Sequence, residues 1–133
     1  MEKSKKILVV DDDSEFSDAI MGLLKLAKYD VVIASDRKEG IEKFYSEKPD
    51  LVLLDIMMDT PVDGFSLCHE MKTSRKDWEK NIPVIFVSAT KEKTGSRHTF
   101  TGEQEGWRGP DDYLDKPIKP AELLECIEKH LEK

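Results

Sequence analysis

The middle of the chain reads Leu51-Val52-Leu53-Leu54-Asp55, four apolar residues closed by a carboxylate. A short apolar run of this kind is typical of a strand in a parallel sheet whose two faces are both covered. An earlier run, Ile7-Leu8-Val9-Val10, is closed in the same way by Asp11 and Asp12. Because ligands bind outside the carboxyl ends of the strands in such a sheet, we expect the three acids to meet at one edge.

Apolar runs and amphipathic stretches alternate along the rest of the chain, which predicts βαβ units and a parallel sheet. The expected strands are residues 5–10, 31–34, 51–55 and 83–87, and a short one around Tyr113 and Leu114. In the flavodoxin-like strand order 2-1-3-4-5, the first and third strands are neighbours at the point where ligands bind. The predicted fold is therefore a flavodoxin-like (βα)5 three-layer α/β sandwich.

The helices between these strands have recognisable starts. Asp13 or Ser14 caps the first helix, and Asp36 with Glu39 makes a capping-box-like start to the second. Pro120 suits the first position of the last helix. The expected inward residues of the first helix are Phe16, Ala19, Ile20, Leu23, Leu24 and Ala27, and those of the second are Ile41, Phe44 and Tyr45.

Residues 91–110 break the pattern, because they hold four of the seven glycines together with Pro110. Glycine and proline disfavour a helix interior. We therefore expect an irregular or shortened fourth helix, with Phe100 and Trp107 packed locally or presented to a partner.

The composition fits one domain, residues 1–133, with a net charge of −7 that disfavours direct binding to nucleic acid. No apolar stretch is long enough to span a bilayer, so we expect a cytoplasmic protein that does not contact a membrane. Cys68 and Cys126 are expected to be free thiols without a metal or disulfide role. The three histidines, His69, His98 and His130, lack the spacing of metal ligands and are expected to be solvated or capping residues.

Five polar side chains follow the predicted strands and define a candidate site: Asp11, Asp12, Asp55, Ser88 and Lys116. Neighbouring carboxylates repel one another unless a cation lies among them, and oxygen ligands favour Mg²⁺. The set offers a carboxylate nucleophile, a metal site, a hydroxyl donor and a fixed cation. These are the groups that receive and stabilise a phosphoryl group.

At this point the chain, from about Lys5 to Leu131, resembles the receiver domains of two-component response regulators, including the single-domain chemotaxis type. The resemblance rests on four motifs in order: Ile7 to Asp13, Leu53 to Met58, Val87-Ser88-Ala89, and Asp112 to Pro117. It implies that Asp55 accepts phosphate from a phosphohistidine on a sensor histidine kinase or phosphotransfer protein, and that the protein then contacts an unknown downstream protein.

The resemblance also implies the role of each site residue. Asp12, Asp55 and the backbone carbonyl of Met57 would bind Mg²⁺ directly, and Asp11 would act through water. Lys116 and Ser88 would contact phosphoryl oxygens. Ser88 and Tyr113 would form the conformational switch, although an aromatic residue in a short strand is equally typical of static packing.

The chain departs from the family pattern in two places. Asp59 stands where the family usually has proline, in a loop one residue longer than usual, and the glycine-rich segment is about six residues longer than expected. The first departure affects access to Asp55 and the second the partner surface.

Two alternatives remain beside the phosphorylation switch. A pseudo-receiver would keep the fold as an interaction module without phosphorylation. A haloacid-dehalogenase-type phosphatase would use Asp11 and Asp13, although Glu15 stands where that family has Thr or Val. The switch would catalyse its own phosphorylation and dephosphorylation without being a turnover enzyme. The sequence fits both a stand-alone regulator and a receiver domain from a longer protein.

Overall fold

The computed structural model describes residues 5–55, 69–70, 82–88, 111–116 and 118–131. The strands are β1 (Lys6–Val10), β2 (Asp30–Ala34), β3 (Leu51–Asp55), β4 (Val84–Ser88) and β5 (Asp112–Asp115). The helices are α1 (Ser14–Leu26), α2 (Arg37–Glu47) and α5 (Pro120–Leu131). The predicted irregular fourth helix, with Phe100 and Trp107, lies outside the described residues.

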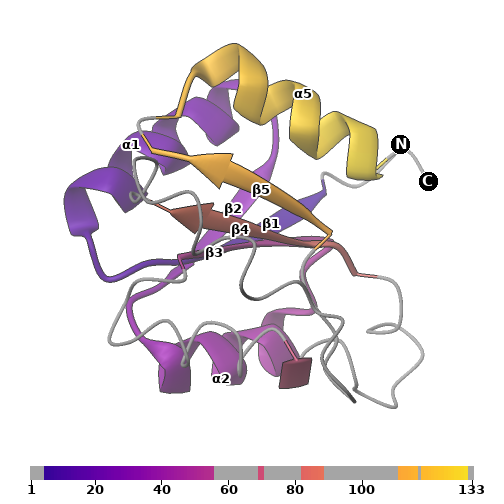
Figure 1. Cartoon of the computed structure of the whole chain (residues 1–133). Coiled ribbons are helices and arrows are strands. Elements are labelled where there is room, and N and C mark those ends of the chain that lie inside the picture. Colours follow the sequence, from indigo (N-terminus) through magenta and orange to yellow (C-terminus); the bar gives the residue numbers. More distant parts are fainter. Residues whose placement is uncertain (1–4, 56–68, 71–81, 89–110, 117, 132–133) are drawn as a thin grey trace.

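The strands form a parallel sheet of order β2-β1-β3-β4-β5, so the predicted flavodoxin-like order is confirmed. In Figure 1, α1 and α5 lie on one side of this sheet and α2 lies on the other. The three-layer arrangement is therefore also confirmed. Within the described residues, no helix has both the length and the apolar character needed to cross a bilayer.

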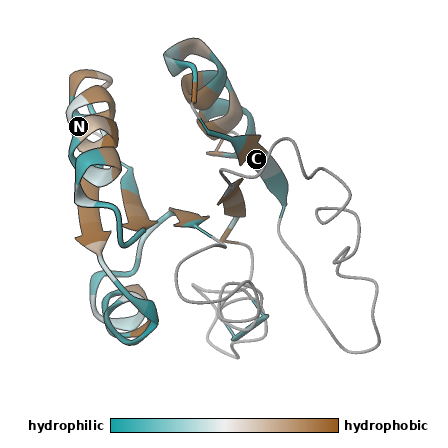
Figure 2. Ribbon diagram, turned by 60° about the vertical axis from the view of Figure 1, so that its left-hand side comes forward, coloured by the Kyte–Doolittle hydropathy of each residue, from teal (hydrophilic) through white to brown (hydrophobic). Residues whose placement is uncertain are grey.

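Side-chain alternation along the strands divides the core in two, because successive residues point to opposite faces of a sheet. Ile7, Val9 and Leu53 face the layer of α1 and α5, where they pack with Leu24 and Ile127. The intervening strand residues, with Phe44 of α2, make the second cluster: Leu8, Val10, Val52, Leu54 and Phe86. Figure 2 shows the central strands in the colour of hydrophobic residues. Their sequences are unbroken apolar runs because both faces of these strands are buried.

The helix starts follow the expected chemistry. Asp13 is the N-cap of α1, and its side chain accepts hydrogen bonds from the backbone N–H groups of Glu15 (3.0 Å) and Phe16 (3.2 Å). Asp36 caps α2 and accepts from the N–H of Glu39 at 2.8 Å. The Glu39 carboxylate turns back toward the residue before the cap, and it accepts a hydrogen bond from the backbone N–H of Ser35 at 2.8 Å.

Two residues assigned to inward faces are exposed, Ala19 on α1 and Tyr45 on α2. Those two predictions are wrong because helical spacing leaves the edge of an apolar stripe undefined. On α1 the buried position next to the stripe is Ser17, which is only 2% exposed.

Candidate functional site

The register of the two central strands brings Asp11 and Asp55 to the same edge of the sheet. Val10 pairs with Leu54 in the β1–β3 ladder, and the residue that follows each of them along the chain is an acid, Asp11 or Asp55. Asp11 is 2% exposed and Asp55 is 5% exposed. The predicted meeting of these two carboxylates is therefore confirmed, and both are largely removed from water.

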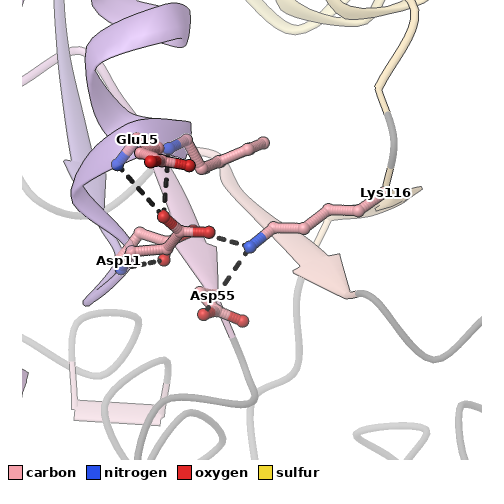
Figure 3. A network of polar contacts seen from close by, with 6 residues as sticks. Asp11, Glu15, Asp55 and Lys116 are labelled. Carbon is pink, nitrogen blue, oxygen red and sulfur yellow. Dashed lines mark hydrogen bonds and ion pairs between the residues drawn. The ribbon is translucent and has the colours of Figure 1, made fainter.

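Lys116 supplies the positive charge of this cluster, as Figure 3 shows. Its Nζ lies 3.1 Å from Oδ2 of Asp11 and 3.9 Å from Oδ2 of Asp55. The Lys116 side chain is only 16% exposed, so the ammonium is partly desolvated. Lys116 follows β5, whose last residue, Asp115, pairs with Ser88 of β4. Because β4 lies between β5 and β3 in the sheet, the ammonium reaches across the end of β4 to the acids.

The ring of Phe16 adds a further contact, with its centroid 4.1 Å from Nζ of Lys116. An aromatic face attracts an ammonium group at this distance. The sequence predicts Phe16 only as an inward residue of the first helix. Its position in the first turn after the acidic segment was the available signal, because that turn begins at the edge where the strands end.

A hydrogen-bonded turn joins the acids to α1. Oδ1 of Asp11 accepts from the backbone N–H of Asp13 at 2.8 Å, and Asp13 in turn caps the helix. Asp12, between them, is exposed. The turn therefore buries the first acid, exposes the second and uses the third as a cap.

The carboxylates suit a divalent cation. Asp11, Asp12 and Asp55 each offer an oxygen, and these oxygens lie within 4.8 Å of one another. Two of the three acids are buried, and burying like charges together is costly without a neutralising cation. The all-oxygen donor set matches Mg²⁺, which keeps several water ligands and takes few protein carboxylates.

The other predicted site residues are described unequally. Ser88 is the last residue of β4, next to Asp115 in the ladder, and its side chain lies outside the described part of the structure. Met57 and Asp59 also lie outside it. Tyr113 is half-buried in β5 and packs edge-on against Phe86, with ring centroids 5.7 Å apart and an interplanar angle of 85°.

Comparison with known sequences gives a consistent result. Residues 7–128 match the response regulator receiver domain family. The chain is 37% identical over 123 residues to the probable transcriptional regulator ycf27 of Guillardia theta, which covers 92% of this chain and 44% of that protein. The chain spans about half the length of the curated relatives it matches.

Solved structures of the same kind superpose on this one. A CheY-like response regulator receiver domain protein from Methanospirillum hungatei has a TM-score of 0.79 and 30% identity, covering 98% of this chain and 95% of that one. The receiver domain of a sensor histidine kinase from Pseudomonas aeruginosa has a TM-score of 0.80 and 26% identity, covering 98% and 100%. That structure has a magnesium ion coordinated in its active site cleft.

Proposed function

Because the chain belongs to the response regulator receiver domain family, a signalling module, we propose that it works as a phosphoacceptor switch with Asp55 as the acceptor. One observation carries the proposal: the buried Asp55 carboxylate ends the central strand with the Lys116 ammonium 3.9 Å away. A carboxylate held near a fixed cation is suited to attack phosphorus and to have its product stabilised.

In the proposed reaction, a carboxylate oxygen of Asp55 attacks the phosphorus of a phosphohistidine. The bond from phosphorus to the histidine nitrogen breaks, and an aspartyl phosphate forms on Asp55. Lys116, held by Asp11 and by the ring of Phe16, is proposed to contact a phosphoryl oxygen. The Ser88 hydroxyl is proposed to contact another oxygen, and Tyr113 to report the change to the surface.

The residues proposed to hold Mg²⁺ are Asp12, Asp55, the carbonyl of Met57 and, through water, Asp11. The ion would offset the negative charge of the phosphoryl group and of the acids. The close approach of the three carboxylates supports this assignment, as does the magnesium in the cleft of the Pseudomonas receiver domain. Without a metal ion, the single positive charge of Lys116 faces the carboxylates of both Asp11 and Asp55.

The proposed phosphoryl donor is a sensor histidine kinase or a phosphotransfer protein, and the proposed downstream partner is another protein. The net charge of −7 opposes direct contact with a phosphate backbone. The curated relatives are named transcriptional regulators, and this chain spans about half of their length. We propose that any DNA contact in such a protein is made outside this acidic domain.

The phosphatase alternative is disfavoured by the position of its second acid. That mechanism would need the Asp13 side chain beside Asp11 as a general acid, but Oδ1 of Asp13 accepts two backbone N–H groups at the start of α1. An acid engaged as a helix cap is poorly placed to transfer protons to a substrate.

Incubation with acetyl phosphate and Mg²⁺, followed by intact-mass measurement, tests the proposal. We expect a gain of one phosphoryl group in the wild type and in Asp18→Asn, a control at an exposed acid of α1. Asp55→Asn should gain none. Full labelling of Asp55→Asn would refute the assignment, no labelling of the wild type would favour the pseudo-receiver, and continuous phosphate release from small esters would favour the phosphatase.

A further inference from the structure

A second group of possible metal ligands lies where β5 meets α5. Asp112 is the first residue of β5, so it lies at the opposite end of that strand from Lys116. Cys126 and His130 are four residues apart on α5, which places them on one face of the helix. Figure 1 shows α5 running alongside β5. The group is thus separate from the acids around Asp55.

The ligand atoms of this group are already close together. Nε2 of His130 lies 3.0 Å from Oδ2 of Asp112, and Sγ of Cys126 lies 3.4 Å from the same oxygen. In a tetrahedral zinc site with ordinary bond lengths, the corresponding separations are about 3.4 Å for nitrogen to oxygen and about 3.6 Å for sulfur to oxygen. All three ligand atoms lie within 4.8 Å of one another. The two separations measured from Oδ2 of Asp112 are therefore already close to those of a tetrahedral site.

The surrounding structure holds the carboxylate in place. Oδ1 of Asp112 accepts the backbone N–H of Tyr113 at 2.8 Å, which leaves Oδ2 directed at the thiol and the imidazole. Burial raises the pKa of Asp112, but hydrogen bonds from His130 and from the Tyr113 N–H outweigh it and hold this pKa below the usual value. An oriented, ionised carboxylate is what a metal ligand requires.

A pocket opens beside two of the three ligands, Asp112 and Cys126. It has a volume of about 410 Å³ and is lined by Asp112, Leu114, Glu122, Glu125, Cys126 and Lys129. Three acids and one lysine make its lining net negative, which favours a cation. Cys126 is 9% exposed and the His130 side chain is 9% exposed, whereas the Asp112 side chain is 31% exposed. Asp112 is thus the most accessible of the three ligands, and Cys126 and His130 are more deeply buried.

We infer that Asp112, Cys126 and His130 form a Zn²⁺ site with three protein ligands and a fourth position open to the pocket. Zinc is the metal that best suits a mixed set of thiolate, imidazole and carboxylate ligands. This inference departs from the expectation, drawn from the sequence, that Cys126 and His130 have no metal role. The structure also shows that His130 is largely buried, not solvated.

Binding must displace the thiol proton, the Nε2 proton of His130 and a lysine. Burial, with the charge of Asp112, raises the pKa of Cys126 to about 12, so the free thiol is protonated and one proton is released as the zinc–sulfur bond forms. The proton that Nε2 of His130 donates to Asp112 moves to Nδ1 in the other neutral tautomer, which frees Nε2 for the metal. Nζ of Lys129 lies 3.5 Å from Oδ2 of Asp112, but this side chain is 68% exposed and can turn into solvent. The same contacts would hold α5 on β5 if the group were only a hydrogen-bonded cluster, so the experiment must separate the two roles.

Zinc titration of the full chain makes this separation, with excess Mg²⁺ present to occupy the carboxylates around Asp55. We expect one Zn²⁺ per chain, and with Co²⁺ as a spectroscopic probe a thiolate-to-metal absorption band. Cys126→Ser keeps a hydroxyl to hydrogen-bond with Asp112, but it should remove the band and weaken zinc binding at least about tenfold. Circular dichroism would verify that the variant is folded.

Two matched variants complete the experiment. Cys68→Ser, at the only other cysteine of the chain, should retain the cobalt band. Lys129→Gln should bind zinc at least as tightly as the wild type, because it removes a competing cation. Absence of stoichiometric binding, or zinc affinity unchanged in Cys126→Ser, would overturn the inference and leave the group as a hydrogen-bonded cluster.

Discussion

The ammonium of Lys116 lies closer to Asp11 than to the proposed acceptor Asp55, at 3.1 Å against 3.9 Å. In this structure the lysine is therefore primarily the partner of a buried acid. A cation in this position stabilises the fold as well as the proposed phosphoryl group, and a bound metal ion would share both roles.

Replacing Lys116 by methionine should reveal this double role. The change keeps an apolar stem beside Phe16 but leaves Asp11 and Asp55 without the ammonium. In a chelator we expect the free energy of unfolding to fall by about 1–3 kcal/mol, and saturating Mg²⁺ should reduce the loss. Denaturant titrations with and without Mg²⁺ measure the difference.

Lys6→Met is the matched control, because Lys6 pairs with Glu47 at 3.0 Å in a more exposed setting. Its effect should stay below about 1 kcal/mol and be independent of Mg²⁺. An equal loss for Lys116→Met in Mg²⁺ and in chelator would mean that no ion shares its position.

Asp12→Asn should separate metal binding from folding. Without Mg²⁺ the variant should be at least as stable as the wild type, because one of three neighbouring negative charges is removed. At a Mg²⁺ concentration 100 times the wild-type Kd, binding stabilises the wild type by about 2.7 kcal/mol; a tenfold weaker site would give about 1.4 kcal/mol. Thermal unfolding across a Mg²⁺ series provides the comparison, and an undiminished shift would remove Asp12 from the site.

Lys28→Gly should stabilise the protein. Lys28 has φ of 75° at the end of α1, where its N–H bonds to the carbonyl of Lys25 at 2.9 Å and the N–H of Tyr29 bonds to Leu24 at 3.0 Å. This is a Schellman motif, which favours glycine at the left-handed position. We expect a gain of about 0.5–1 kcal/mol by urea denaturation. Lys25→Gly, inside the last turn, should instead cost about 1 kcal/mol; destabilisation by both variants would contradict this account.

Glu39→Gln should destabilise the protein at neutral pH but not in strong acid. Hydrogen bonds from the Ser35 N–H, Lys43 and the Ser35 hydroxyl lower the pKa of Glu39 from 4.5 to about 2. A lowered pKa stabilises the fold above the unfolded-state value, and this stabilisation is lost as the pH falls from about 4.5 to about 2. Because the side chain is 37% exposed, the effect at pH 7 should be below about 1 kcal/mol.

Denaturant titrations between pH 7 and pH 2.5 follow this effect, with Glu42→Gln on the exposed face of α2 as control. The control should change stability by no more than a few tenths of a kcal/mol. A deficit of Glu39→Gln that stays constant down to pH 2.5 would show that the ionised carboxylate is not its source.

The sheet and the helix caps could be predicted because their causes are local. Apolar runs followed or closed by acids indicate strands β1 and β3, and Asp13 and Asp36 cap the helices that follow them. The meeting of Asp11 and Asp55 also follows from the sequence, since it needs only the strand order and the ends of two strands.

Contacts that depend on how a helix packs could not be predicted in this way. Helical spacing identifies Cys126 and His130 as neighbours on α5, but no local signal places them against Asp112 of β5. The contact of Phe16 with Lys116 is similar, because its partners come from opposite ends of the chain. Such pairs are set by the position of one layer on another, which a single sequence encodes only indirectly.

The contacts within the acidic turn are local in sequence, whereas the contact between Lys116 and Asp11 joins distant parts of the chain. This difference affects the folding kinetics. The bonds that shape the turn span two or three residues, whereas the bond from Lys116 to Asp11 spans 105. Local contacts form early in folding, and contacts that close long loops tend to form late. If the cation site is completed only after the folding barrier, Mg²⁺ would slow unfolding and leave the folding rate almost unchanged. The ion would then stabilise the completed fold without stabilising the transition state for folding.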